Sequence, residues 1–202
     1  MHVSLVGSEM CIRDRMNIIV FFSGTGTNLQ SILQNEKKFN YKVISTFTNN
    51  PYAYGIDISK DYSVDCKILD HKKFDSREKF DIEVDAYLQK LKPDYVILAG
   101  YMRILSKFLV DKWKQKIINI HPSLLPKYPG LNTHERVLLA GDKLHGTTIH
   151  YVTSDLDAGP IIRQQSIEIE PHDTIESLTE KIKKLENKIY PEAISRPVSY
   201  TH

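Results

Sequence analysis

Cysteine is scarce in this chain of 202 residues, which contains only Cys11 and Cys66. Two cysteines cannot make a disulfide framework or a cysteine-based zinc site, and their scarcity suits a reducing compartment, so we expect a cytoplasmic protein. The sequence also lacks any apolar run near the roughly 18 residues of a membrane span. Its net charge is only +2 with histidine neutral, which argues against nucleic acid or an anionic membrane as a partner.

The two ends of the chain do not resemble the rest of it. Residues 1–15 (MHVSLVGSEMCIRDR) show no secondary-structure pattern and have too short an apolar region for a signal peptide. Residues 196–202 (RPVSYTH) look equally foreign, and both segments resemble translated adaptor or assembly sequence. We therefore predict a single domain over residues 16–195, a native start at Met16, and a native C-terminus that is missing.

Between these ends, apolar strand-like runs alternate with helical stripes. The patterns predict strands at residues 17–22, 43–47, 65–69, 95–100, 117–121, 148–152 and 161–169. Helices are expected after residue 28 and at 53–61, 76–92, 106–113, 133–140 and from 174 onward, the last with an apolar stripe that begins at Ile175. This alternation predicts an α/β fold with a doubly wound, mostly parallel, Rossmann-like sheet that has helices on both faces.

One strand ends in chemistry-bearing residues. The run at 117–121 carries Asn119 and His121 to its carboxyl end on one face, because side chains alternate along a strand. Ligands of open parallel sheets bind at that edge. An amide donor beside an imidazole suits a reaction that builds negative charge on a carbonyl oxygen. The alternative is a structural asparagine and a histidine at the edge of the core.

A small-residue loop at 23–28 (SGTGTN) follows the first strand and precedes a helix. Free backbone N–H groups and the helix dipole make such a turn an anion site. Leu29 stands where a dinucleotide fingerprint has its third glycine, and no acidic residue follows at the end of the second strand. We therefore expect a phosphate monoester rather than NAD, the alternative being a tight turn without a ligand.

Two further loops could complete a site. The segment 101–105 (YMRIL) could hold a flat, acidic, aromatic ligand, or it could be core with a snorkelling Arg103. The loop at 153–160 carries Asp155 and Asp157, which are equally plausible as a functional carboxylate. His145 and His150 have no recognisable metal-ligand spacing, so we expect strand or turn roles for them and no metal.

Six motifs in order carry a resemblance to a known family: SGTGTNL, FDSRE, LAGYMRIL, NIHPSLLPKYPGLNTH, HGTTIHYV and DLDAGPII. Together they resemble the phosphoribosylglycinamide formyltransferases over about residues 16–195. The PKYPG segment looks like this family rather than the related methionyl-tRNA formyltransferases.

The resemblance implies formyl transfer from 10-formyltetrahydrofolate, as co-substrate, to the amine of 5′-phosphoribosylglycinamide in de novo purine synthesis. The phosphoribosylglycinamide site would comprise Gly26, Thr27, Asn28 and Glu186. The formyltetrahydrofolate site would comprise Arg77, Met102, Arg103, Ile104, Leu105, Thr153 and Asp157. Partners would be small-molecule substrates, with a monomer or homodimer as the assembly.

The same resemblance makes Asn119, His121 and Asp157 catalytic. Asn119 and a protonated His121 would stabilise the oxyanion of a tetrahedral intermediate, and Asp157 would tune His121. Two alternatives stay open from the sequence: a hydrolase that passes the formyl group to water, and an inactive, truncated protein that only binds folate or nucleotide.

Overall fold

The structure is a computed structural model that describes residues 15–196. The two segments that look foreign, 1–15 and 196–202, lie outside these residues except for Arg15 and Arg196. That they flank a single native domain stays a prediction. Within the described part of the chain, no helix is long and apolar enough to cross a membrane.

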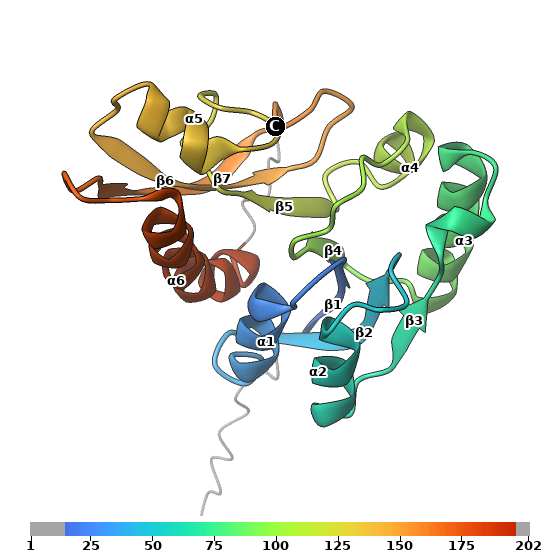
Figure 1. The fold of residues 1–202 in the computed structure, drawn as a ribbon. Helices are drawn as coiled ribbons and strands as arrows, with labels where there is room; N and C mark the ends of the chain where they lie inside the picture. Colours follow the sequence, from blue (N-terminus) through green and yellow to red (C-terminus); the bar gives the residue numbers. More distant parts are fainter. Residues whose placement is uncertain (1–14, 197–202) are drawn as a thin grey trace, which may run out of the picture.

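A seven-stranded sheet forms the centre of the described residues, in the order β3-β2-β1-β4-β5-β6-β7 (Figure 1). The first five strands are mutually parallel, whereas β6 runs antiparallel to both β5 and β7. This confirms the mostly parallel sheet. The strands are β1 (Met16–Phe22), β2 (Tyr41–Thr48), β3 (Cys66–Ile68), β4 (Tyr95–Leu98), β5 (Ile117–His121), β6 (Leu144–Tyr151) and β7 (Ile161–Glu168).

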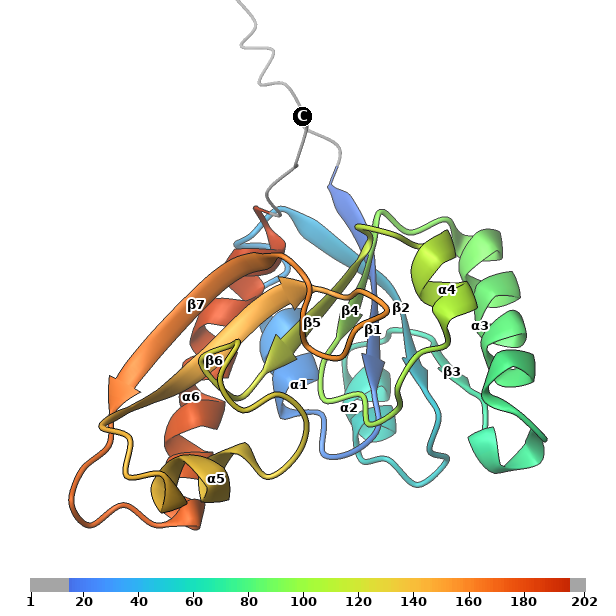
Figure 2. The same cartoon turned by 90° about the horizontal axis from the view of Figure 1, so that it is seen from above.

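Helices cover both faces of this sheet (Figures 1 and 2). They are α1 (Thr27–Gln34), α2 (Gly55–Asp61), α3 (Arg77–Leu91), α4 (Lys107–Lys112), α5 (Thr133–Leu139) and α6 (Ile175–Ile194), with a short 3-10 helix η1 (His71–Lys73). Alternation along β1 divides the core. Ile18, Val20 and Phe22 pack with α1, α2 and α6 on one face, whereas Ile19 and Phe21 pack with α3 and α4 on the other.

Side-chain caps stabilise the N-termini of three of the predicted helices, α3, α4 and α6. Ser76 accepts a hydrogen bond from the backbone N–H of Lys79 at the start of α3, and Ser106 accepts one from Leu109 at the start of α4. At the start of α6, Thr174 and Ser177 form a reciprocal capping box. Each cap satisfies backbone donors that the first helical turn leaves free.

Two local predictions were wrong. The strand expected at 148–152 begins earlier, at Leu144, because Gly146 lies inside it rather than ending it. A Cβ on Gly146 would stand 2.2 Å from the backbone oxygen of Gln165 and 2.6 Å from Leu124, so the missing side chain allows a close strand contact. The apolar stripe of α6 also does not bury Ile175, which is 43% exposed and lines a cavity.

The order of the strands fixes where a ligand can bind. The chain builds β1, β2 and β3 in one direction and then returns to place β4 on the other side of β1. The loops that follow β1 and β4 therefore leave the sheet in opposite directions. A crevice opens there at the carboxyl ends of the strands, as in other doubly wound folds.

Candidate active site

A cavity of about 710 Å³ lies at this edge of the sheet. Its walls come from the end of β5, the loop after β4, the loop between β5 and α5, the loop between β6 and β7, and α6. Most residues singled out in the sequence line it: Asn28, Met102, Arg103, Ile104, Leu105, Asn119, His121, Thr153, Asp157 and Glu186. The fold therefore brings together residues that are up to 158 positions apart, as for Asn28 and Glu186.

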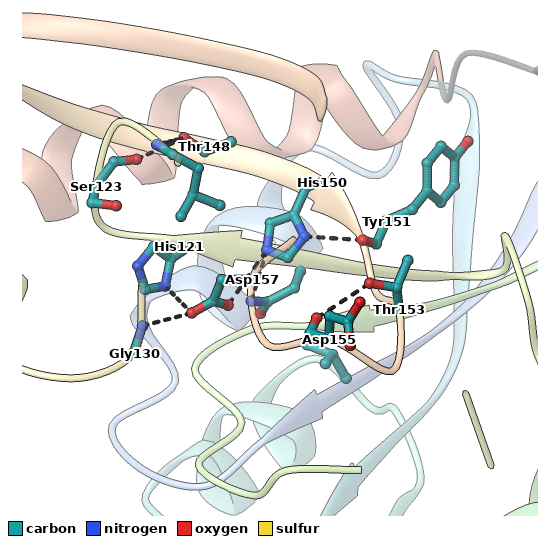
Figure 3. A network of polar contacts seen from close by, with 12 residues as sticks. His121, Ser123, Gly130, Thr148, His150, Tyr151, Thr153, Asp155 and Asp157 are labelled. Carbon is teal, nitrogen blue, oxygen red and sulfur yellow. Dashed lines mark hydrogen bonds and ion pairs between the residues drawn. The ribbon is translucent and has the colours of Figure 1, made fainter. Parts of the chain in front are cut away.

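The carboxylate of Asp157 lies between two imidazoles (Figure 3). Its Oδ2 is 3.4 Å from Nδ1 of His121, and its Oδ1 is 3.7 Å from Nε2 of His150. The backbone N–H of Gly130 donates to Oδ2 at 2.8 Å. Asp157 itself has a φ of 53°, a left-handed conformation that Asp tolerates better than most residues. The carboxylate is thus held from two loops, whereas Asp155 on the same loop is exposed.

His121 faces hydrogen-bond acceptors on both sides of its ring. Nε2 lies 2.9 Å from the carbonyl oxygen of Tyr128, so this nitrogen carries a hydrogen. Nδ1 faces the Asp157 carboxylate, which also accepts. A ring protonated on both nitrogens satisfies both contacts. The two side chains are only 7% and 8% exposed, so a positive charge on the ring would be stabilised by the carboxylate with little screening by water.

His150 is the site residue for which the sequence predicts only a strand role. Its Nδ1 lies 2.9 Å from the carbonyl oxygen of Tyr151 and therefore carries the hydrogen. Burial lowers the pKa of His150, against smaller raising effects of the Tyr151 carbonyl and the Asp157 carboxylate, and the charge of His121 adds the smallest effect, which also lowers it. The ring is neutral, which leaves the lone pair of Nε2 as an acceptor.

That lone pair orients Asn119. Nδ2 of Asn119 lies 3.3 Å from Nε2 of His150 and donates one of its two hydrogens to it. The contact fixes which end of the amide is the donor and leaves the second hydrogen for another acceptor. Alternation along residues 148–152 shows which of these side chains share a face of their strand. It does not show that His150 lies opposite Asn119, because that pairing depends on the antiparallel register of β6 against β5.

Asn28 and Glu186 also line the cavity and meet at the junction of α1 and α6. Nδ2 of Asn28 donates to Glu186 at 3.0 Å, and the Thr147 hydroxyl donates to the same carboxylate at 3.4 Å. Burial raises the pKa of Glu186, although both hydrogen bonds oppose that shift. Oδ1 of Asn28 is buried and has no hydrogen-bond partner among the described residues. Gly26 and Thr27 begin α1 but are not among the residues that line the cavity.

The loop that carries Met102 and Arg103 is tied to the small-residue loop after β1. The Ser23 hydroxyl donates to Asn49 at 2.6 Å and accepts from the backbone N–H of Met102 at 2.8 Å. The Arg103 guanidinium stacks on the ring of Phe80, 4.5 Å from its centroid. Arg77 is the first residue of α3 and does not line the cavity, so its contact with a ligand stays a prediction.

A second histidine pair is formed by His145 and His134, and His134 also lines the cavity. His145 is fully buried, and its Nε2 lies 2.8 Å from Nδ1 of His134. Burial, and then the neighbouring histidines, lower the pKa of His145 to about 4. Across residues 15–196 no group of three or more His, Cys, Asp or Glu side chains is placed to hold a metal ion.

Comparisons with known proteins point in one direction. The family model described as "Formyl transferase" matches residues 16–194. The chain is 42% identical over 182 residues to the phosphoribosylglycinamide formyltransferase of Escherichia coli (strain K12), covering 89% of this chain and 86% of that protein. It is 38% identical over 182 residues to the trifunctional purine biosynthetic protein adenosine-3 of Bos taurus, covering 89% of this chain but only 18% of that protein.

A solved structure extends the likeness to three dimensions. The phosphoribosylglycinamide formyltransferase from Coxiella burnetii, in complex with CHES, matches with a TM-score of 0.86 at 43% identity. The match covers 90% of this chain and 86% of that one.

Proposed function

The chain belongs to the formyl transferase family, and from this premise we propose that it is a phosphoribosylglycinamide formyltransferase of purine biosynthesis. It transfers the formyl group of 10-formyltetrahydrofolate to the amine of 5′-phosphoribosylglycinamide. The observation that carries the proposal is the cluster of Asn119, His121, His150 and Asp157 on one wall of a cavity large enough for both substrates to meet.

The glycinamide nucleotide lies on the α1 side of the cavity. Glu186 accepts hydrogen bonds from its amine or amide nitrogen, and the unpartnered Oδ1 of Asn28 accepts another. A buried carboxylate is stabilised by such donors because burial otherwise disfavours its charge. The phosphate lies against Gly26 and Thr27 at the amino end of α1, where free N–H groups and the helix dipole favour an anion.

The formyl donor lies against the loops at residues 101–105 and 153–157. Met102, Ile104 and Leu105 supply apolar surface for its ring system, and Arg103 supplies a cation for its acidic part. Because Ser23 joins this loop to the small-residue loop after β1, the two substrate sites share one support. The formyl carbon of the donor then meets the amine in front of β5.

Reaction begins when the neutral amine attacks the formyl carbon and the carbonyl oxygen becomes an oxyanion. The second N–H of Asn119, left over from its bond to His150, donates to that oxygen. His121 adds a charge-assisted hydrogen bond by exchanging its contact with Tyr128 or Asp157 for the oxyanion. The Asn119 donor is already oriented before the reaction, so it stabilises the developing charge without reorganisation.

Collapse of the tetrahedral adduct needs one proton to move. The attacking nitrogen loses a proton, and the leaving N10 of tetrahydrofolate gains one, so the products are the formamide and tetrahydrofolate. His121 is the group suited to relay this proton. Asp157 stabilises its charged form through the 3.4 Å contact. The scarcity of cysteine supports a cytoplasmic location for the reaction.

Tetrahydrofolate formation from 10-formyltetrahydrofolate tests this function. We expect product only when 5′-phosphoribosylglycinamide is present, and much less with the dephosphorylated ribosylglycinamide. Tetrahydrofolate that formed at the same rate without any amine would identify a hydrolase instead. Binding of the donor without turnover, even with both substrates, would identify a non-catalytic binding protein.

A further inference from the structure

Tyr101 is the first residue of the donor loop at 101–105 and forms part of the cavity wall, although the family resemblance assigns it no contact with the donor. The residue is 8% exposed. Its ring packs edge-on against Phe21, with centroids 5.3 Å apart, and lies 6.4 Å from Phe47. The side chain thus borders both the aromatic core beneath α3 and the space where the formyl donor lies.

The Tyr101 hydroxyl is buried and has no hydrogen-bond partner among residues 15–196. Two other deeply buried tyrosines do have partners. The hydroxyl of Tyr41 donates to the carbonyl oxygen of Ile32 at 2.7 Å, and that of Tyr190 donates to Leu98 at 2.9 Å. An unpaired buried hydroxyl is costly and rare in folded proteins, so this one calls for an acceptor.

The surroundings of the hydroxyl indicate what kind of acceptor fits. Burial, followed by the charge of Asp81, raises the pKa of Tyr101 well above its usual value, so the hydroxyl keeps its hydrogen. Nε of Arg103, two residues along the same loop, is also buried and unpartnered among the described residues. Two unpaired N–H or O–H donors on one wall suit a ligand that presents hydrogen-bond acceptors.

We propose that Tyr101 recognises the formyl donor by donating a hydrogen bond to a neutral acceptor, a carbonyl oxygen or ring nitrogen, of its flat ring system. This rests on the proposed function, because it needs the donor in this cavity. A ring acceptor fits better than a carboxylate, since a carboxylate would lose its hydration among Phe21, Phe47 and Phe80. The hydroxyl therefore acts as a specificity residue for the donor.

The substitution Tyr101→Phe tests the proposal because it removes one oxygen and keeps the ring. We expect the KM for 10-formyltetrahydrofolate to rise about 3- to 10-fold, the effect of one neutral hydrogen bond. The KM for 5′-phosphoribosylglycinamide and kcat stay near the wild-type values. The melting temperature of the protein without substrates stays the same or rises, because an unpaired hydroxyl is lost. An unchanged donor KM would overturn the proposal.

Tyr41→Phe is the matched control, since its hydroxyl is paired within the core and Tyr41 is not among the residues that line the cavity. It should lower the melting temperature by about 2–4 °C and leave the donor KM unchanged. If Tyr101→Phe behaved like this control, its hydroxyl would serve the fold through a bound water, and the proposal would fail. Wild-type turnover is measured in the same series, so a failure of the proposed function shows as absent activity before any variant is compared.

A donor without its glutamate tail separates the two acceptor types. If the rise in KM caused by Tyr101→Phe persists with 10-formyltetrahydropteroate, the hydroxyl contacts the ring, as proposed. If the rise disappears with that compound, the hydroxyl contacts a tail carboxylate, and the assignment to the ring is overturned.

Discussion

Removing the amide of Asn119 should slow formyl transfer severely. In the structure Nδ2 of Asn119 donates one hydrogen to Nε2 of His150, and in the proposed mechanism its second hydrogen bonds the oxyanion. Loss of one such donor costs about 10²–10³ in kcat, or roughly 3–4 kcal/mol of transition-state stabilisation. The cost to folding should be smaller, on the order of 1 kcal/mol, because Asn119→Ala removes one neutral hydrogen bond, the one to His150.

The assay is steady-state formation of tetrahydrofolate with both substrates saturating, together with a thermal melt of each variant. Asn35→Ala serves as a control, because it removes an amide that bonds only locally, to Ser31 at the end of α1. His150→Leu, which leaves Asn119 but removes its orienting acceptor, should lower kcat by about 2- to 10-fold. In the double variant the two losses should not multiply, since both act through one donor. A kcat for Asn119→Ala within tenfold of wild type would refute the reasoning.

Two further predictions concern charge. Asp157→Asn keeps the shape and the acceptor for Gly130 but removes the charge opposite His121, so kcat should fall about 10- to 100-fold. Asp155 lies on the same loop but is exposed, so Asp155→Asn should lower kcat far less. Equal effects of the two substitutions on kcat would contradict the role of Asp157. Burial lowers the pKa of His145 from 6.5 to about 4. Between pH 4 and pH 6.5 the unfolded chain therefore binds a proton at this residue that the folded protein does not. The free energy of unfolding should fall, by on the order of 1 kcal/mol, when the pH is lowered from 6.5 to 5. Urea titrations at both pH values should show a weaker dependence for His145→Gln, and an identical dependence would exclude His145 as its source.

Features that depend on neighbours in the sequence could be predicted from it. The end of β5, with Asn119 and His121 emerging into a loop, follows from an apolar run and the period of two. The caps at Ser76, Ser106 and Thr174 follow from the residue types that satisfy a first helical turn. That a ligand binds at the carboxyl edge of the sheet follows from strand–helix alternation, because parallel strands all end at one edge. The position of the crevice along that edge depends on the strand order.

Features that depend on strand register or on the close approach of distant segments could not be predicted from the sequence. His150 meets Asn119 only because β6 turns antiparallel beside β5, and nothing within residues 144–152 states that direction. The strand predicted at 148–152 leaves out Gly146, whose missing side chain allows the Gln165 backbone to approach. The choice of Asp157 over Asp155 depends on which carboxylate the loop turns inward, toward Gly130 and the two histidines.

The most direct test of the account is formyl transfer by the His121→Ala variant. Tetrahydrofolate formation should be abolished in this variant, because charge stabilisation and proton relay both depend on the His121 ring. The affinity for 10-formyltetrahydrofolate, measured through the quenching of Trp113 fluorescence by the bound donor, should stay close to the wild-type value. The donor loops at 101–105 and 153–157 are unchanged in this variant. Turnover at the wild-type rate by the His121→Ala protein would contradict the account.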